Sequence, residues 1–225
     1  VTNALNTPSK GLSPQRAMEI ARAVLPRDTI ATCDAGASRL LVVQKWQSYG
    51  PREFLTSNGL GSMGYAVPAA MGAKAGLPDK EVWAIDGDGC FQMTNQELTT
   101  AAVEDFPIKV ALINNGNLGM VRQWQTLFYE GRYSNTKLGS GDTYVPDFVQ
   151  LSEALGCAAI RVTKAEEVIP AIQKAREIND RPVVVEFIVG EDAQVWPMVA
   201  AGASNSDIEY ARGLRPFFDE EESAG

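Results

Sequence analysis

Two short polar turns, each directly after an apolar run of strand length, carry the side chains of this sequence that are best suited to chemistry. Gly87-Asp88-Gly89 follows the run 82–85, and Asn115 and Asn117 follow the run 110–113. Asp88 offers a carboxylate, Asn115 an amide oxygen, and a carbonyl near Asn117 a third oxygen. A few oxygen ligands, with positions left for water and a substrate phosphate, suit Mg²⁺. Together the turns predict a Mg²⁺ site that tethers a diphosphate, although each alone would be an ordinary surface turn.

A helix predicted over 94–103 separates the two turns. Thr94 or Asn95 can serve as its N-cap, and Glu97 lies at the spacing of a capping box from Thr94. The unit therefore has the order strand, turn, helix, strand, turn. In a parallel sheet this order places both turns at the carboxyl ends of their strands, where open α/β sheets bind ligands.

The remaining chain alternates helical patterns with short apolar runs, which predicts a doubly wound α/β fold with a mainly parallel sheet and helices on both faces. Ser13-Pro14 is a typical helix start. We expect a linker at 1–12, a ligand-binding domain at 13–190, and a C-terminal arm with an acidic tail at 191–225. Residues 131–144 are predicted to form a mobile loop near the site. Strands are predicted at 29–33, 54–57, 82–85, 110–113, 158–162 and 183–188.

Composition narrows the class of protein. The chain has 225 residues, of which 45% are hydrophobic and 21% charged, and its net charge of −8 argues against nucleic acid and anionic membranes as partners. We see no signal peptide and no membrane-spanning run, and we expect a cytoplasmic protein. The cysteines, Cys33, Cys90 and Cys157, are predicted to be free. The absence of histidine excludes a Ser-His-Asp group built from this chain alone.

Two glycine-containing corners precede the central turns. Asp34 to Ser38 follows a predicted strand and opens a helix, so Gly36 and the free N–H groups there can bind an anion. The segment 59–64 has the pattern Gly-x-Gly-x-x-Gly, and Asp86 lies about twenty residues further on, which is the outline of a dinucleotide fingerprint. An NAD-dependent oxidoreductase is therefore an alternative. It is weakened by the polar run before Gly59, and it leaves the turns at Asp88 and Asn115 unexplained.

The central motifs resemble those of a known family. Gly87-Asp88-Gly89 followed by Asn114-Asn115 resembles the diphosphate-binding motif of thiamine diphosphate (ThDP) enzymes. The run 83–129 resembles the carboxy-terminal domain of the acetohydroxyacid (acetolactate) synthase catalytic subunit, and the similarity extends from about 57 to 218. At 37–38 the family has Gln-His where this chain has Ala37 and Ser38. The resemblance implies cofactor contacts at Gly36, Ala37, Ser38, Gly61, Met63, Gly87, Asp88, Gly89, Cys90, Met93, Asn115, Asn117, Gly119 and Met120.

Individual roles are also implied by the resemblance. Mg²⁺ would be held by the side chains of Asp88 and Asn115 and by the main-chain carbonyl of Asn117. The Gly61 carbonyl would meet the aminopyrimidine of ThDP, Met63 would pack beside that ring, and Met93 would bend the cofactor into its V shape. Met120 and Trp124 share a helix face. The family places them in the substrate pocket, where the tryptophan favours 2-ketobutyrate as acceptor, whereas the pattern alone also allows a core-facing stripe.

The implied reaction decarboxylates pyruvate and joins the resulting hydroxyethyl carbanion to a second 2-keto acid, a step of branched-chain amino acid biosynthesis. Family members of this kind also carry a pyrimidine-binding domain, with an activating glutamate, and a domain that binds FAD. Neither fits in 225 residues. We therefore assign no catalytic residue to this chain and expect it to be inactive alone, either as an excised domain or as a subunit of a split enzyme.

The expected partners follow from this incompleteness. They are a second copy in a homo-oligomer or a complementary chain with the pyrimidine domain, a possible regulatory subunit, and small 2-keto acids as substrates. Three other functions stay open at this level. They are a related ThDP-dependent carboligase or decarboxylase, the NAD-dependent oxidoreductase, and a non-catalytic assembly domain.

Overall fold

The structure is a computed structural model that describes residues 12–139, 145–191 and 193–209. The predictions for 1–11, for the acidic tail and for part of the 131–144 loop lie outside the described residues. Within the described ranges, no helix is both long and apolar enough to cross a lipid bilayer. The three cysteines are all described, and each is free and buried, as predicted.

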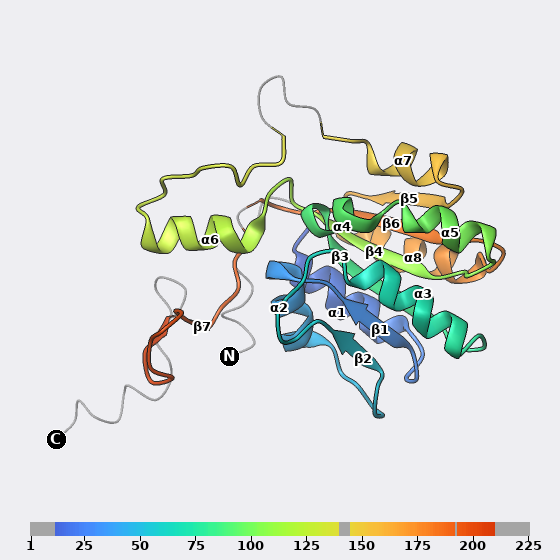
Figure 1. Ribbon diagram of the computed structural model, residues 1–225, viewed down its shortest axis with the longest axis horizontal. Helices are drawn as coiled ribbons and strands as arrows, with labels where there is room; N and C mark the ends of the chain where they lie inside the picture. The colour runs from blue at the N-terminus through green and yellow to red at the C-terminus, as the bar shows by residue number, and fades with distance from the viewer. Residues whose placement is uncertain (1–11, 140–144, 192, 210–225) are drawn as a thin grey trace.

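Six strands of the described chain form one parallel sheet in the order β2-β1-β3-β4-β6-β5 (Figure 1). Their bounds are β1 Ile30–Cys33, β2 Phe54–Thr56, β3 Val82–Gly87, β4 Lys109–Asn114, β5 Ala158–Val162 and β6 Val183–Ile188. Short strands β7 (Met198–Val199) and β8 (Ile208–Glu209) form a separate antiparallel pair. The prediction of a mainly parallel, doubly wound sheet is confirmed.

The strand order reverses next to β1, and this reversal determines where a ligand can bind. From β1 the chain passes outward to β2, and it then returns to β3 on the other side of β1. In β3 and β4, Gly87 pairs with Ile113, so the two strands end at the same level. Open α/β sheets bind ligands at such a reversal, beyond the carboxyl ends of the strands.

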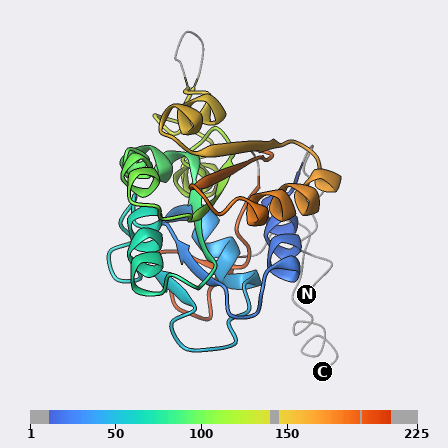
Figure 2. The same cartoon turned by 90° about the vertical axis from the view of Figure 1, so that its right-hand side faces the viewer.

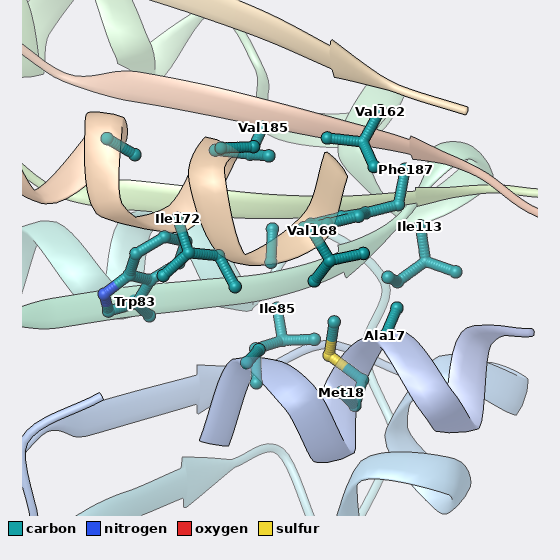
Figure 3. Close-up of a cluster of buried hydrophobic side chains, with 14 of the residues drawn as sticks. Ala17, Met18, Trp83, Ile85, Ile113, Val162, Val168, Ile172, Val185 and Phe187 are labelled. Carbon is teal, nitrogen blue, oxygen red and sulfur yellow. The ribbon is translucent and has the colours of Figure 1, made fainter. Parts of the chain in front are cut away.

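Helices cover both faces of the sheet (Figures 1 and 2). On one face α1, α2 and α8 pack against alternate strand residues such as Trp83, Ile85 and Phe187 (Figure 3). On the other face α3, α4, α5 and α7 pack against Ala84, Leu112 and their neighbours. The helices are α1 Pro14–Val24, α2 Gly36–Lys45, α3 Ala66–Gly76, α4 Asp88–Thr94, α5 Glu97–Val103, α6 Gly119–Phe128, α7 Phe148–Ala154, the short 3₁₀ helix η1 Ala165–Glu167 and α8 Val168–Glu177.

The prediction of one helix over 94–103 is wrong, because the structure has two short helices there, α4 and α5. The chain enters α4 directly at Asp88, because Gly87 is extended and ends the strand. A second short helix, α5, follows with Gln96 as its N-cap residue. The predicted capping box at Thr94 does not form among the described residues, since the Thr94 hydroxyl donates instead to the Gly64 carbonyl at 3.1 Å.

Three further segments can be compared with their predictions. The predicted start of α1 is confirmed, because the Ser13 side chain accepts from the Arg16 amide. Leu12, assigned to the linker, is buried and bridges to Val189, so packing begins there. In the predicted loop 131–144, residues 136–138 pair with 116–118: the Leu118 amide donates to Thr136 at 2.7 Å, and the Leu138 amide to Gly116 at 2.9 Å.

Lys109 is a buried charge at the amino end of the sheet, where it begins β4. It is 3% exposed, and its Nζ donates to the Pro107 carbonyl and to Asn179 Oδ1, both at 2.9 Å. Burial lowers the pKa of Lys109 to about 8, against 10.5 for a solvated lysine, although Glu81 opposes the shift. The folded state therefore releases this proton at a lower pH than the unfolded chain does.

We expect this shift to make Lys109 a source of pH-dependent stability. Between about pH 8 and 10.5 the unfolded state binds more protons at this site, so the contribution of Lys109 to the free energy of unfolding rises with pH. Urea denaturation across this window should show a smaller rise for Lys109→Met than for the wild type. Lys174→Met, on the exposed side of α8, is the control and should retain the wild-type slope. Equal slopes in all three proteins would contradict the prediction.

Candidate functional site

A cavity of about 270 Å³ lies at the carboxyl ends of β1, β3 and β4. It is lined by the start of α2, the turn that enters α4, and the turn that enters α6. Asp88 is its charged lining residue, and no lysine or arginine of the described chain lines it. The structure gathers these sequence-predicted residues around the cavity: Gly36, Ala37, Ser38, Gly61, Met63, Gly87, Asp88, Gly89, Cys90, Asn115, Asn117, Gly119, Met120 and Trp124.

Met93 is the exception among the predicted site residues. It is 53% exposed on α4 and lies outside this lining of described residues. The reason is the early start of α4, which places Met93 in the last turn of the helix, near Gly64. Its proposed role as the support on which the cofactor bends stays a prediction.

Asp88 is held in place by main-chain amides. It is 2% exposed, its Oδ1 accepts from the Gly89 amide at 2.9 Å, and its Oδ2 accepts from the Gly116 amide at 2.6 Å. Burial raises the pKa of Asp88 to about 7, and the hydrogen bonds from Gly116 and Gly89 act in the opposite direction. A buried carboxylate of this kind is stabilised by a bound cation, which replaces the proton as its partner.

The second turn brings Asn115 and Asn117 to the same cavity. Gly116 between them has φ +67°, which favours glycine, and it lets the chain reverse. Asn115 Oδ1 accepts from the Asn117 amide at 3.0 Å, and Asn117 Nδ2 donates to the Asn115 carbonyl at 2.9 Å. Asn117 Oδ1 is buried and has no hydrogen-bond partner in the described chain. A carboxylate and several amide or carbonyl oxygens fit a hard cation such as Mg²⁺.

Two helix N-termini complete the cavity wall. Within the described ranges, no side chain caps the first turn of α2 or of α6, so main-chain N–H groups there are available to an anion. The Ser38 hydroxyl donates to the Ala35 carbonyl at 3.3 Å instead of capping α2. At the start of α6, a Cβ on Gly119 would lie 2.8 Å from Asn115 Nδ2, so a larger residue there would require the Asn115 side chain to move.

Asp34 is a buried acid beside the cavity that sequence reasoning did not assign to the site. Asp34 Oδ1 accepts from the amides of Ala35 at 2.8 Å and Gly64 at 3.0 Å, and its Oδ2 accepts from Ala66 at 2.8 Å. It thereby joins the end of β1 to the glycine-rich loop before α3. The signal in the sequence was only a polar residue directly after an apolar strand.

Asp86 bears on the NAD-dependent alternative. It is 0% exposed, and neither carboxylate oxygen has a partner among the described residues. Burial, with Asp34 nearby, holds its pKa well above the usual range. A side chain buried in this way cannot reach the ribose of a dinucleotide, which removes the acidic residue that this fingerprint requires. Burial likewise raises the pKa of the neighbouring Cys90 thiol, which donates to the Ala35 carbonyl at 3.6 Å.

Gln123 is a further residue that sequence reasoning missed. It lies on α6, between Met120 and Trp124, and its side chain is buried. Its Nε2 donates to the Val195 carbonyl at 2.9 Å, and its Oε1 accepts from the Val195 amide at 2.8 Å. The side-chain amide thus pairs with the main chain as a neighbouring strand would, and it fixes the C-terminal arm against α6.

The parallel sheet, the cavity at its carboxyl edge and the two oxygen-bearing turns define a diphosphate-binding α/β domain. Residues 34–187 match the family described as "Thiamine pyrophosphate enzyme, C-terminal TPP binding domain". The chain therefore belongs to this family of ThDP-binding domains, and the resemblance noted in the sequence is confirmed.

Individual relatives make the similarity more specific. The chain is 72% identical over 217 residues to the acetolactate synthase large subunit of Corynebacterium glutamicum, covering 96% of this chain and 35% of that protein. It is 40% identical over 214 residues to the mitochondrial acetolactate synthase catalytic subunit of Saccharomyces cerevisiae, covering 92% of this chain and 30% of that protein. The chain thus spans about one third of the length of these relatives.

A solved structure extends the similarity beyond the synthases. It is the ThDP-dependent 4-hydroxybenzoylformate decarboxylase of Rhodococcus jostii RHA1, which matches with a TM-score of 0.73 at 25% sequence identity. The match covers 82% of this chain and 34% of that chain. The fold is therefore shared with a ThDP enzyme that is named for a different activity.

Proposed function

We propose that this chain forms the Mg²⁺- and ThDP-binding part of an acetolactate synthase-like enzyme. The observation that carries the proposal is the meeting of the Asp88 and Asn115 turns at one cavity, between two uncapped helix N-termini of the described chain. The complete enzyme would decarboxylate pyruvate and join the resulting two-carbon unit to a second 2-keto acid. The 72% identity of this chain to an acetolactate synthase large subunit supports this choice of reaction.

In this proposal each element of the cavity has a definite task. Asp88 and Asn115 hold Mg²⁺ by their side chains, and Asn117 holds it by its main-chain carbonyl. The main-chain amides at the starts of α2 and α6 would bind the diphosphate. When bound, ThDP itself supplies the electron sink for decarboxylation. The residues of this chain therefore bind and orient, and the activating glutamate is supplied by another domain.

The acceptor 2-keto acid would bind beside α6. Met120 and Trp124 line the cavity from this helix, and the paired Gln123 and Val195 hold the helix against the arm. We further propose a cytoplasmic homo-oligomer in which FAD binds outside this chain, with a regulatory subunit as an additional partner. These proposals rest on the similarity to the synthases.

A related ThDP-dependent decarboxylase is the second candidate. The solved decarboxylase with a TM-score of 0.73 supports it, as does the Ala37-Ser38 departure from the synthase pattern. Product analysis distinguishes the two functions in the complete protein. Pyruvate should yield acetolactate if the enzyme is a synthase, and a free aldehyde if it is a simple decarboxylase.

A thermal melt of the complete protein tests whether it binds ThDP together with Mg²⁺. A ligand that binds only the folded state raises the apparent melting temperature with the logarithm of its saturation. We expect a rise with Mg²⁺ plus ThDP that chelation by EDTA abolishes, and no rise with Mg²⁺ plus NAD. A rise with NAD, or a ThDP effect that is indifferent to EDTA, would contradict the proposal.

A further inference from the structure

Glu186 is a buried acid that the cofactor site does not explain. It lies in the middle of β6, is 1% exposed, and is flanked by buried apolar residues along an otherwise apolar strand. It does not belong to the described cavity lining. A carboxylate in such a place is costly unless each of its oxygens is satisfied, so its partners indicate why it is there.

Both oxygens of Glu186 are used, one on each side of the strand. Its Oε1 accepts from Asn114 Nδ2 at 2.8 Å, and its Oε2 accepts from Arg161 Nε at 2.6 Å. Arg161 extends the chain of contacts to Asp147, where its Nη2 donates to Oδ1 at 2.7 Å. Sheet register brings the three strands together, because Glu186 pairs with Leu112 of β4 and with Arg161 of β5.

The amide oxygen of Asn114 contacts the turn that belongs to the candidate metal site. Asn114 Oδ1 accepts from the Gly116 amide at 3.1 Å, and the same amide donates to Asp88 Oδ2 at 2.6 Å. A continuous set of hydrogen bonds therefore runs from Asp147 through Arg161, Glu186 and Asn114 to the turn that carries Asn115.

The chemistry of Glu186 determines how Asn114 is oriented. An ionised carboxylate can only accept hydrogen bonds, so it must face the NH₂ group of the Asn114 amide. The amide oxygen of Asn114 is then directed to the Gly116 N–H. With the opposite orientation, two donors would face each other at Gly116, and the turn that carries Asn115 and Asn117 would shift.

We propose that Glu186, held by Arg161, is a positioning residue for the Mg²⁺ ligands of this domain. It acts by fixing the Asn114 amide, which in turn fixes the main chain between the two asparagine ligands. The inference rests on the proposed function, because it takes Asp88 and Asn115 as metal ligands. Partners that orient ligands in this way alter metal affinity about 10- to 100-fold when they are removed.

The test uses Glu186→Gln in the complete protein. The glutamine side chain has nearly the same shape, but one of its ends is a donor and cannot satisfy both Asn114 and Arg161. At saturating ThDP, we expect the Mg²⁺ concentration for half-maximal activity to rise about 10- to 100-fold, with kcat at saturating Mg²⁺ within about twofold of the wild type. Mn²⁺ binding followed by electron paramagnetic resonance should weaken by the same factor, which gives a readout besides activity.

Asn114→Ser is a second variant that leaves the pair of Glu186 and Arg161 intact. It should shift Mg²⁺ half-saturation in the same direction, so the inference does not depend on the folding of one variant. Glu81→Gln is the matched control. Glu81 also pairs with an arginine, Arg176 Nε at 3.0 Å, but it precedes β3 at the end of the sheet away from the cavity. It should leave Mg²⁺ half-saturation unchanged.

The outcomes separate this inference from the proposed function. If the wild type depends on Mg²⁺ but Glu186→Gln and Asn114→Ser match it within about twofold, the positioning role is wrong and the cofactor site stands. If Glu81→Gln shifts the Mg²⁺ dependence as much as Glu186→Gln, the effect is general destabilisation and the inference is also overturned. If the wild type is indifferent to Mg²⁺, the proposed function fails and this inference fails with it.

Discussion

Replacing Asp88 by alanine should abolish the Mg²⁺-dependent binding of ThDP. The variant loses the anionic ligand of the proposed metal, and the Gly116 amide loses the nearer of its two acceptors, at 2.6 Å. Removing an outer partner of a metal ligand already costs about 10- to 100-fold in affinity, so loss of the ligand itself should exceed about 100-fold. Isothermal titration of ThDP into the complete protein, with Mg²⁺ and with EDTA, measures the effect directly.

Asp28→Ala provides the control for charge alone. Asp28 is an exposed carboxylate that pairs with Lys80 on the surface. Its removal changes the net charge by the same amount and should leave ThDP affinity within about twofold, because exposed pairs contribute little. Retention of Mg²⁺-dependent ThDP binding by Asp88→Ala would refute the assignment of this carboxylate to the metal.

The second large effect is expected at Phe91, which connects the cavity wall to the core. It is fully buried on α4, and its ring packs edge-on against Phe148 of α7, with centroids 5.8 Å apart at 76°. Phe91→Ala should lower the free energy of unfolding by about 3–5 kcal/mol, from lost burial and the cavity left behind. That is a large share of the roughly 5–15 kcal/mol typical of whole domains. Urea denaturation followed by circular dichroism measures the change.

Val103→Ala is the matched truncation on the surface. Val103 ends α5 and is 73% exposed, so its loss should change the stability by less than about 0.5 kcal/mol. A loss below about 1 kcal/mol for Phe91→Ala would show that α4 does not depend on the core in the way that its packing indicates.

Much of the fold could be predicted because apolar runs and polar turns alternate along the chain. The runs 82–85 and 110–113 are buried strands, and the turns after them meet at one cavity. The break between α4 and α5 could not be predicted, because threonine is a residue type that often caps a helix and Thr94 is therefore expected to begin one. Its hydroxyl instead bonds Gly64, which is distant in sequence.

The residues that support the site were harder to find than those that line it. A single glutamate in the apolar run 183–188 indicates a buried charge, but not its partners. Asn114, Arg161 and Glu186 become neighbours only through the register of three parallel strands. Gln123 gives no local signal either, since the main chain it pairs with lies 72 residues away.

The lack of lysine and arginine in the described cavity lining has a consequence for ligand choice. The charged group there is itself an acid, so a diphosphate that arrives without a cation is repelled by Asp88 and attracted only by amide dipoles. A cation alone would meet Asp88 and the oxygens of the asparagine turn but would lack the oxygens that a diphosphate brings. In the proposed function we therefore expect the cavity to bind metal and diphosphate together more tightly than it binds either one alone.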